Sequence, residues 1–549
     1  MRSEVAIVGF GRTPYSRARP GDPVLTVDEY IAWAADLALQ KAGMSKNDFD
    51  GQGLGVAHAE AAHTVNWSAA VAENLGISPT VLLRADQGGA SASAMLIRAA
   101  AMIQSGIVDR VLVVGADTPL HIPSAAPGLP LSPERTRGVY WDFQGPFGVM
   151  GASAQFALVL SRYMHEHKVT PEQLGKIAVN ARYHAGLHEG AIYRTPFTLQ
   201  DYLDSRVLTD PIRLLDCVPI VNGGLAYVVT SAKTARTLTD RPVYLRGFGE
   251  ANNYYRGSRS LPDITYTGFT QAAPQALQMA GVTQRDIQFL QPYDDYPFIA
   301  MMTIEDHGFC KKGEGGRFVE EHDLHFDGDF PMSTDGGQLS GGQPGGAIGG
   351  FMPLIESVTQ LRGEAGARQV RDARIGISCG FGGIPLRPPR PQLHFARPVH
   401  GALSMSAIVN PATGKPLPTI TDLTRPFWTA AKEGRLMLQK CQRCATFNFH
   451  PKPWCIECGS RELQWTDAKP FGTIYATTIS RSVAMNFPGW QAELPVLLCL
   501  IDLDDGARMY GQVTHCKPEA LHIGMRVKAY FEAISDDAGI PKFRPLQDA

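Results

Sequence analysis

The feature that most constrains the fold is a motif that occurs twice, in which a glycine pair opens a helix and an apolar strand follows. The first copy runs from GGASASAMLIRAAAMIQSG (88–106) to RVLVVGAD (110–117), and the second from GGAIGGFMPLIESVTQLRG (345–363) to ARIGISCGFGG (373–383). Two similar halves that bury these helices between two sheets would produce such a repeat. A Gly-Gly-Ala helix start can also recur by chance.

The flanking sequence continues the alternation of strands and helices. EVAIVGFGR (4–12) is predicted to be a buried strand, and TVDEYIAWAADLALQKAG (26–43) a helix that ends at Gly43. The apolar run RVLVVGAD is typical of a strand in a parallel sheet. Strands alternating with helices favour an α/β fold. Residues 118–235 are interpreted as an insertion of mixed helix and loop that covers a site.

The composition changes near residue 396, where prolines and turn signals replace periodic sequence. We therefore divide the chain into a first domain over 1–395, a linker over 396–424 and a separate module over 425–549. The module is predicted to have a helix at PFWTAAKEGRLML, a cysteine-rich segment and short strands that suit a small β-barrel.

Charge and apolar content exclude several classes of protein. The chain has 549 residues, a net charge of −2 and 44% hydrophobic residues, so nothing favours nucleic acid or an anionic membrane as a partner. No apolar run is long enough to span a bilayer, and residues 1–10 lack the apolar core of a signal peptide. Nine cysteines in a chain of this length do not indicate a disulfide scaffold, which fits a reducing cytoplasm.

Four cysteines of the C-terminal module have the spacing of a metal site. They are Cys441, Cys444, Cys455 and Cys458, in the pattern CxxC, ten residues, CxxC. Two such turns supply four thiolates for tetrahedral Zn²⁺ and leave no open position, so we predict one structural zinc. Iron could occupy the same four-sulfur site. The alternative is two unrelated cysteine pairs.

The turn in LLRADQGGASASA (82–94) has the form of a site that presents a nucleophile at a helix start. The helix dipole and the free N–H groups of the first turn would favour a thiolate there. The turn holds no cysteine, serine, threonine or lysine at the place where a nucleophile would be expected. The turn therefore predicts a binding site without its nucleophile.

Several longer motifs resemble the sterol-carrier-protein-type thiolases. They are PFGVMGASAQFALVLSRYMHEH, SRVLTDPIRLLDCVPIVNGGLAYVVTSA and GGQLSGGQPGGAIGG, which occur in the family's order within residues 1–390. Residues 420–549 resemble the zinc-ribbon and OB-fold family that accompanies thiolase-like enzymes and contacts acyl-CoA. The resemblance implies a five-layer αβαβα thiolase fold with a C-terminal zinc ribbon plus OB-fold β-barrel. It also implies an acyl-CoA substrate and a homodimer formed through the thiolase-like domain.

The chain departs from a thiolase at its reactive positions. By this resemblance Gly89 replaces the acyl-accepting cysteine, while Tyr293 and Gln343 replace the two catalytic histidines. Cys379 keeps the place of the family's second cysteine. The same departures resemble thiolase-like aldolases that cleave steroid side chains, although Gly341 stands where those aldolases carry a second tyrosine.

These departures predict retro-aldol cleavage of a 3-hydroxyacyl-CoA to a ketone or aldehyde plus a short acyl-CoA, without a covalent intermediate. A base removes the hydroxyl proton, the Cα–Cβ bond breaks, donors stabilise the thioester enolate, and an acid protonates it. Tyr293 is the expected base, with Asp294 or Asp295 as alternatives; the plainer interpretation of YDDY is a strand end. Gln343 is expected to donate to a thioester oxygen, or to be a loop residue. Cys379 either protonates the enolate or is a packed thiol.

Four residues are expected to line the substrate site: Gly89, Gly341, Gly345 and Phe381. Residues 336–350 hold eight glycines in fifteen residues, which lets the backbone approach a ligand closely. The absence of a side chain at position 89 should leave room for a branched substrate. His307, in EDHGF, is a candidate site group, but the structural interpretation is favoured because a lone histidine is more often structural.

Two other functions remain open. An acyltransferase that uses the Cys379 thiol would form a trappable acyl-enzyme, and a non-catalytic acyl-CoA-binding scaffold would bind its ligand without turnover. The missing cysteine argues against the first, and the retained glycine-rich loops argue against the second.

Overall fold

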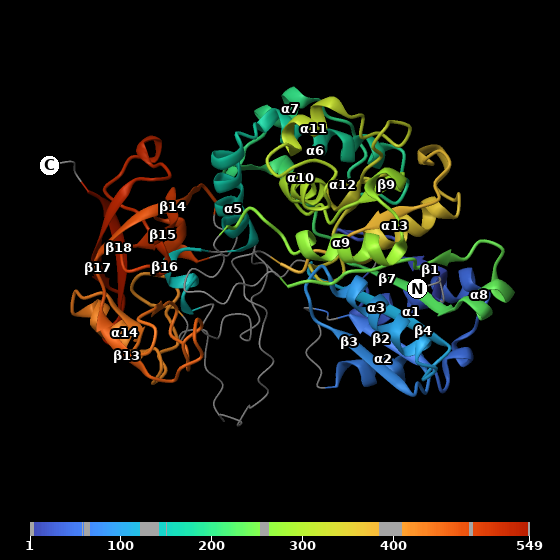
Figure 1. Ribbon diagram of the computed structural model, residues 1–549, viewed down its shortest axis with the longest axis horizontal. Helices are drawn as coiled ribbons and strands as arrows, with labels where there is room; N and C mark the ends of the chain where they lie inside the picture. Colours follow the sequence, from blue (N-terminus) through green and yellow to red (C-terminus); the bar gives the residue numbers. More distant parts are fainter. Residues whose placement is uncertain are drawn as a thin grey trace.

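The computed structural model of the chain describes residues 5–22, 24–57, 59, 66–120, 142–149, 151–252, 263–383, 409–482 and 487–546. Figure 1 shows a β-rich C-terminal module, coloured orange to red, beside a larger α/β part that contains both glycine-pair helices. Helix α5 (Gly151–His167) lies on the side of the larger part that faces the module.

The N-terminal half is built on a six-stranded sheet in the order β3-β2-β4-β7-β1-β8. Its strands are β1 (Val5–Arg12), β2 (Gly53–Ala57), β3 (Val81–Ala85), β4 (Arg110–Asp117), β7 (Gly223–Ser231) and β8 (Val243–Tyr244). β2 pairs in parallel with β3 and β4, whereas β7 runs antiparallel to β4 and β1. The central strands are almost wholly buried, because helices cover both faces of the sheet.

Helices α1 (Val27–Ala42) and α2 (Trp67–Leu75) pack on one face of this sheet. α1 begins with a capping box at Thr26 and ends at Gly43 in the left-handed conformation, as predicted. The two glycine-pair helices, α3 (Ser91–Gln104) and α13 (Phe351–Leu361), share one buried core on the opposite face. The predicted burial of this helix pair in the interior is confirmed.

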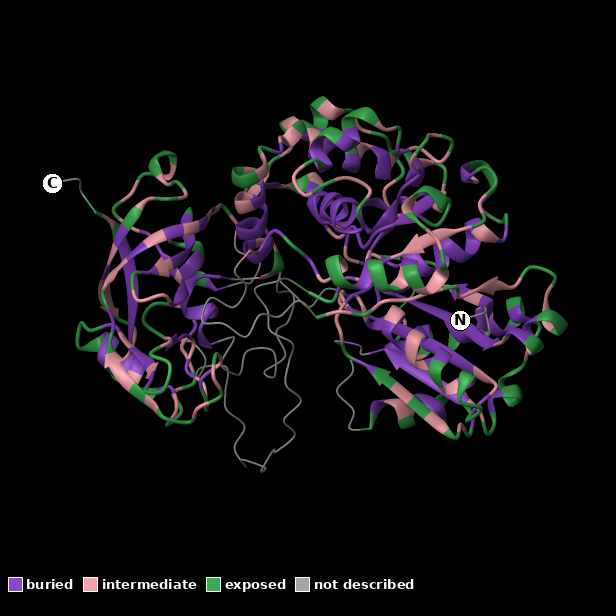
Figure 2. Cartoon of the chain, viewed as in Figure 1, coloured by how far each residue is buried: buried purple, intermediate pink, exposed green. Residues whose placement is uncertain are grey.

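A second sheet lies beyond α13, and the described residues give it two parallel strands, β9 (Phe289–Gln291) and β10 (Gly376–Ser378). The remaining helices of this part are α6 (Pro171–Gly186), α7 (Leu199–Asp204), α8 (Ala232–Leu238), α9 (Phe269–Ala280), α10 (Pro297–Asp306), α11 (Gly315–Glu321) and α12 (Gly337–Gly341). Every residue of α10 is buried, as Figure 2 shows by colour. The layers follow the predicted order of helix, sheet, helix, sheet, helix.

The C-terminal module starts with α14 (Arg425–Lys432) and a small sheet in the order β12-β11-β13. The strands of that sheet are β11 (Met437–Cys441), β12 (Phe447–Asn448) and β13 (Leu463–Asp467). An antiparallel path β16-β15-β14-β17-β18 follows. It comprises β14 (Phe471–Ser480), β15 (Val496–Leu503), β16 (Arg508–Gln512), β17 (Arg526–Ala533) and β18 (Gly539–Pro545), with α15 (Pro488–Gln491) between β14 and β15. A single bridge, Val513 to Phe543, joins the ends of the path, so the pairing among described residues is not that of a fully closed barrel.

Two segments of the larger part reach into the module. Strand β5 (Val207–Asp210), which also pairs with β6 (Ile212–Arg213), adds to the edge of β14, with Asp210 opposite Ile479. The ring of Phe143 lies 4.9–5.3 Å, between centroids, from three rings of the module: Phe427, Trp428 and Phe449. The module is therefore held to the larger part by strand pairing and by aromatic packing.

The predicted insertion over 118–235 differs from the structure in one respect. Its last part, residues 223–231, is β7 in the middle of the N-terminal sheet, because this apolar run is buried on both faces. Residues 121–141 and 150 lie outside the described residues.

The expected linker over 396–424 is described only from residue 409 onward. That portion packs on the rest of the protein, since the Asn410 side-chain amide donates to the carbonyl of Ile534 at 2.6 Å. The amide of Thr419 donates to the carboxylate of Asp142 at 2.9 Å. Within the described ranges, no helix has both the length and the apolar character that a membrane crossing requires.

Candidate active site

Two glycine-containing turns from opposite halves meet at a cavity of about 1130 Å³. One turn, residues 87–90, precedes α3, and the other, residues 379–383, follows β10. A Cβ on Gly88 would lie 2.4 Å from the carbonyl oxygen of Gly382. Backbone without a side chain is therefore needed for the two turns to approach this closely.

The cavity gathers most of the residues that the sequence predicts for the site. Six of them line it: Gly89, Tyr293, Gln343, Gly345, Cys379 and Phe381. Asp294 and Gly341 are not among its lining residues.

Tyr293 lies at the centre of a hydrogen-bonded group of side chains. Its hydroxyl donates to the carbonyl of Gly346 at 2.8 Å and accepts from the Gln343 amide at 3.1 Å. The same Gln343 nitrogen donates to the side-chain oxygen of Gln338 at 2.7 Å. Burial raises the pKa of Tyr293 well above its usual range, and the neighbouring Asp295 raises it further. The phenol keeps its proton, so the geometry favours a hydrogen-bond donor over the expected base.

The ring of Tyr293 fills the space above Gly89. A Cβ on Gly89 would lie 2.1 Å from Cε2 and 2.5 Å from the hydroxyl oxygen of Tyr293. These distances are far below van der Waals contact, so no side chain fits at position 89 while Tyr293 keeps this place. The expectation that position 89 leaves room for a branched substrate is therefore wrong, because the phenol of Tyr293 occupies that space.

Asp294 faces away from the cavity and anchors the glycine-rich loop. One carboxylate oxygen accepts from the amide of Gln338 at 2.8 Å, and the other accepts from the Ser333 hydroxyl at 2.9 Å. Burial raises the pKa of Asp294 to about 7. Its contacts position the loop that carries Gln338 and Gln343.

Asp295 faces the cavity instead. Its Oδ1 is buried and has no hydrogen-bond partner among the described residues. Burial raises the pKa of Asp295 well above its usual value, and the adjacent Asp294 raises it further. A buried carboxyl oxygen without a partner is costly, so its placement indicates a polar ligand group.

The two loop glycines of the prediction face different surroundings. A Cβ on Gly341 would lie 3.2 Å from Cε of Met352 and 3.5 Å from a guanidinium nitrogen of Arg12, behind the loop. Gly345 lines the cavity with a φ of +75°, and a Cβ there would lie 2.6 Å from a carboxylate oxygen of Asp117. Gly345 therefore lets the backbone turn beside the cavity, whereas Gly341 does not reach it.

Cys379 and His307 contact each other in the lining of the cavity. The sulfur lies 3.6 Å from Nε2 of His307, and both residues line the cavity. Nδ1 of His307 lies 2.8 Å from the carbonyl of Thr303. Burial raises the pKa of the Cys379 thiol and lowers the pKa of His307 to about 4, so both groups are neutral near pH 7.

Asp295 and His307 are the two site residues to which the sequence interpretation gave too little weight. A strand-like alternation continued beyond β9 would place Tyr293 and Asp295 on one face and Asp294 on the other, which would have favoured Asp295. No sequence signal links His307 to Cys379, since 72 positions separate them.

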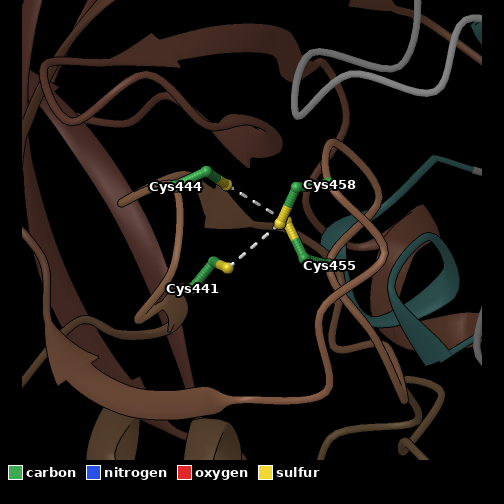
Figure 3. A group of neighbouring side chains, drawn as sticks. All are labelled: Cys441, Cys444, Cys455 and Cys458. Carbon is green, nitrogen blue, oxygen red and sulfur yellow. Dashed lines mark hydrogen bonds between the residues drawn. The ribbon is translucent and has the colours of Figure 1, made fainter.

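The four predicted metal ligands converge in the C-terminal module. The sulfurs of Cys441, Cys444, Cys455 and Cys458 all lie within 4.8 Å of one another (Figure 3). Two of the sulfur pairs, Cys441 with Cys458 and Cys444 with Cys455, are 3.5 Å apart. A tetrahedral site with Zn–S bonds of about 2.3 Å separates its sulfurs by about 3.8 Å, so the cluster fits a structural zinc.

Four family models match the chain in the order in which its domains occur. Residues 5–191 match the thiolase N-terminal domain and residues 249–386 match the thiolase C-terminal domain-like family. Residues 428–464 match the ChsH2 rubredoxin-like zinc ribbon domain, and residues 465–532 match the ChsH2 C-terminal OB-fold domain. The predicted combination of a thiolase-like core with a zinc ribbon and an OB-fold is confirmed.

Known relatives match the thiolase-like part. An acetyl-CoA acetyltransferase of Methanothermobacter thermautotrophicus is 31% identical over 382 residues, which cover 69% of this chain and 96% of that protein. The chain therefore belongs to the thiolase family, and it is an enzyme.

Within the family, some relatives carry the names of carbon–carbon lyases. A 17-hydroxy-3-oxo-4-pregnene-20-carboxyl-CoA lyase of Mycobacterium tuberculosis is 30% identical, over 66% of this chain and 92% of that protein. The solved structure of an Ltp2-ChsH2(DUF35) aldolase is 27% identical with a TM-score of 0.58, over 68% of this chain and 93% of that chain. The expected resemblance to thiolase-like aldolases is confirmed by these similarities.

Proposed function

We propose that this enzyme is a carbon–carbon lyase that cleaves a 3-hydroxyacyl-CoA by a retro-aldol reaction, without a covalent acyl-enzyme. The observation that carries the proposal is the ring of Tyr293 in the space above Gly89. A thiolase needs a nucleophilic side chain at that position, and here a phenol replaces it. The names of the lyase and aldolase relatives support the same reaction class.

The cavity supplies hydrogen-bond donors for the charge that develops on the thioester oxygen. In the proposed complex the Tyr293 hydroxyl turns from the Gly346 carbonyl to the substrate oxygen, while Gln343 continues to donate to the phenol. Asp295 is assigned the role of a second donor, because burial favours the protonated form of its carboxyl. Neutral donors in a buried site stabilise an enolate more than they would in water.

The reaction then needs a group that moves one proton. The proton leaves the 3-hydroxyl as the Cα–Cβ bond breaks, and Cα of the enolate gains one to give the short acyl-CoA. Cys379 lines the same cavity as Tyr293, and its thiol is the proposed proton carrier. Asp294 is assigned a positioning role, since its two hydrogen bonds hold the loop.

Acyl transfer is the competing function, since a relative carries the name acetyl-CoA acetyltransferase. It would require the buried Cys379 thiol to act as the nucleophile. The raised pKa of that thiol opposes formation of the thiolate that attacks a thioester. A trappable acyl-enzyme on Cys379 would favour this function.

The test supplies branched 3-hydroxyacyl-CoA esters, including tertiary alcohols of steroid type, and follows the ketone and the short acyl-CoA by mass spectrometry. Release of both products in equal amounts, with no acylated peptide, is the expected result. Tight binding of every ester in the panel without cleavage would support a non-catalytic scaffold instead.

The proposed setting of the enzyme is the cytoplasm, whose reducing conditions suit a four-thiolate zinc site. We further propose a homodimer formed through the thiolase-like part, in which β3 is the edge strand of the N-terminal sheet. Sedimentation at micromolar concentration should give twice the mass of one chain. A single-chain mass would contradict the dimer.

A further inference from the structure

We propose that Cys379 and His307 act as one proton-carrying pair. In this proposal the sulfur takes the hydroxyl proton of the substrate while its own proton passes to Nε2 of His307, and both transfers then reverse to protonate Cα. The inference rests on the proposed lyase function and assigns its proton carrier. His307 acts on the substrate only through Cys379.

The hydrogen bonds of His307 determine which of its nitrogens is free to accept. Nδ1 lies 2.8 Å from the Thr303 carbonyl, which can only accept, so Nδ1 carries the proton of the neutral ring. Nε2 then has a free lone pair, and it lies 3.6 Å from the sulfur of Cys379. The thiol therefore donates to Nε2, which leaves the lone pairs of the sulfur free to accept a proton from the cavity.

One ring contact and one hydrogen bond to the backbone hold His307 in place. The ring of Phe269 packs against it with 4.9 Å between centroids. Gln284 donates to the His307 carbonyl at 2.9 Å at the end of α10. Cys379 is fixed as well, because its amide donates to the Gln291 carbonyl of β9 at 2.9 Å. The pair is thus built into two neighbouring elements and needs no rearrangement to transfer a proton.

Three other polar side chains that line the cavity, Tyr293, Asp295 and Gln343, are poorer candidates for the proton acceptor. Burial raises the pKa of Tyr293 and of Asp295 above their usual values, so each group holds its proton more tightly than it would in water. The Gln343 amide does not titrate. His307 has a pKa lowered to about 4 and remains unprotonated at neutral pH, so its Nε2 is available to receive the proton.

The proposed steps balance without any further reactant. As the Cα–Cβ bond breaks, its electron pair becomes the enolate and the hydroxyl oxygen becomes the carbonyl of the leaving ketone or aldehyde. The pair gains one proton and one positive charge, which faces the negative enolate and is stabilised by it. The sulfur then gives a proton to Cα while Nε2 returns its proton to the sulfur, and the pair is neutral again.

The first test measures exchange of the α-protons of acetyl-CoA and propionyl-CoA in D₂O, a reaction that needs no C–C cleavage. Wild-type enzyme should catalyse it, and Cys379→Ala should lower the rate by about 10²–10⁴-fold. His307→Gln keeps an acceptor for the thiol but cannot take up a proton, so it should lose about as much. Wild-type exchange in His307→Gln would overturn the proposal. Cys499→Ala and His322→Gln, neither of which is among the residues that line the cavity, are the matched controls.

The second test needs no turnover and separates the pair from the lyase function. Proton transfer from the thiol to Nε2 creates the thiolate that iodoacetamide alkylates. Peptide mapping should therefore show Cys379 alkylated at least about tenfold more slowly in His307→Gln, because the amide accepts the hydrogen bond of the thiol but cannot take up its proton. Equal alkylation rates would refute the pair whether or not the enzyme cleaves its substrate. Failure of cleavage with a retained alkylation difference would refute only the lyase proposal.

Discussion

The phenol of Tyr293 stands where a side chain on residue 89 would begin, with Cε2 only 2.1 Å from the ideal Cβ position of Gly89. Gly89 does not have a positive φ, so this glycine is required by contact with Tyr293 and not by backbone conformation. The two positions are therefore coupled: one residue lacks a side chain because the other fills its space.

Gly89→Ala should destabilise the protein by about 1–3 kcal/mol, the usual cost of overpacking. In a Tyr293→Ala background the same substitution should cost close to nothing, because the ring is gone. Urea unfolding of the four proteins of this double-mutant cycle measures the coupling. Equal costs of Gly89→Ala in both backgrounds would show that the ring does not occupy this space in solution.

Gly89→Cys should not create thiolase activity. The new side chain collides with Tyr293, and Gln343 cannot carry the protons that a histidine would. The measurement is thiolysis of acetoacetyl-CoA by free CoA, with wild-type protein as the matched control. A large gain in thiolysis would show that a nucleophile at position 89 is sufficient.

Tyr293→Phe should lower cleavage by about 10²–10³-fold, the effect of losing one oxyanion donor. Binding of a product acyl-CoA should change little, because the hydroxyl acts mainly in the transition state. Steady-state kinetics together with calorimetric binding separate the two effects. Unchanged kcat would remove Tyr293 from the mechanism.

Substitutions of Asp295 should distinguish a donor from a base. Asp295→Asn keeps an N–H donor and should retain activity within about tenfold, whereas Asp295→Leu should lose about 10²–10³-fold. If Asp295 is instead the base, both variants should be almost inactive. Asp294→Asn is the matched control. It should mainly lower the stability of the protein, because the hydrogen bonds of Asp294 are to Ser333 and to Gln338 of the glycine-rich loop.

Asp295 should also make stability depend on pH. Its folded-state pKa is raised above the unfolded value of about 3.9, so the folded state binds the proton more tightly. Stability is therefore lost as pH rises from the unfolded pKa towards the folded one. Asp295→Asn lacks this loss, and its melting temperature should exceed that of wild type increasingly as the pH rises through a window that begins at about pH 4. A constant difference across that window would contradict the raised pKa.

Cys455→Ser should release the metal and loosen the C-terminal module. A structural zinc contributes directly to the folding of a small ribbon. Elemental analysis should show one zinc per wild-type chain and none in the variant, and hydrogen exchange should rise across 425–546. Cys516 lies outside the cluster, so the control variant Cys516→Ser should keep its zinc. Wild-type protein that contains no zinc would contradict the prediction.

The sequence by itself determined the broad architecture and the metal site. The repeated glycine-pair helices, the alternation of strands and the four spaced cysteines are local patterns, and the elements they specify form where expected. The membership of β7 in the central sheet was missed, because an apolar run within a mostly helical and loop segment carries no sign of its pairing partner.

Only the tertiary structure decided which side chains share the cavity and how tightly each of them holds its proton. Asp294 and Asp295 are adjacent in sequence, yet one is bonded to the loop and the other has an oxygen without a partner beside the cavity. Gly89 and Tyr293 come into contact, as do Cys379 and His307, only when the two halves pack. Proton affinities depend on burial and on neighbouring charges, which are properties of the packed chain and are not encoded at single positions.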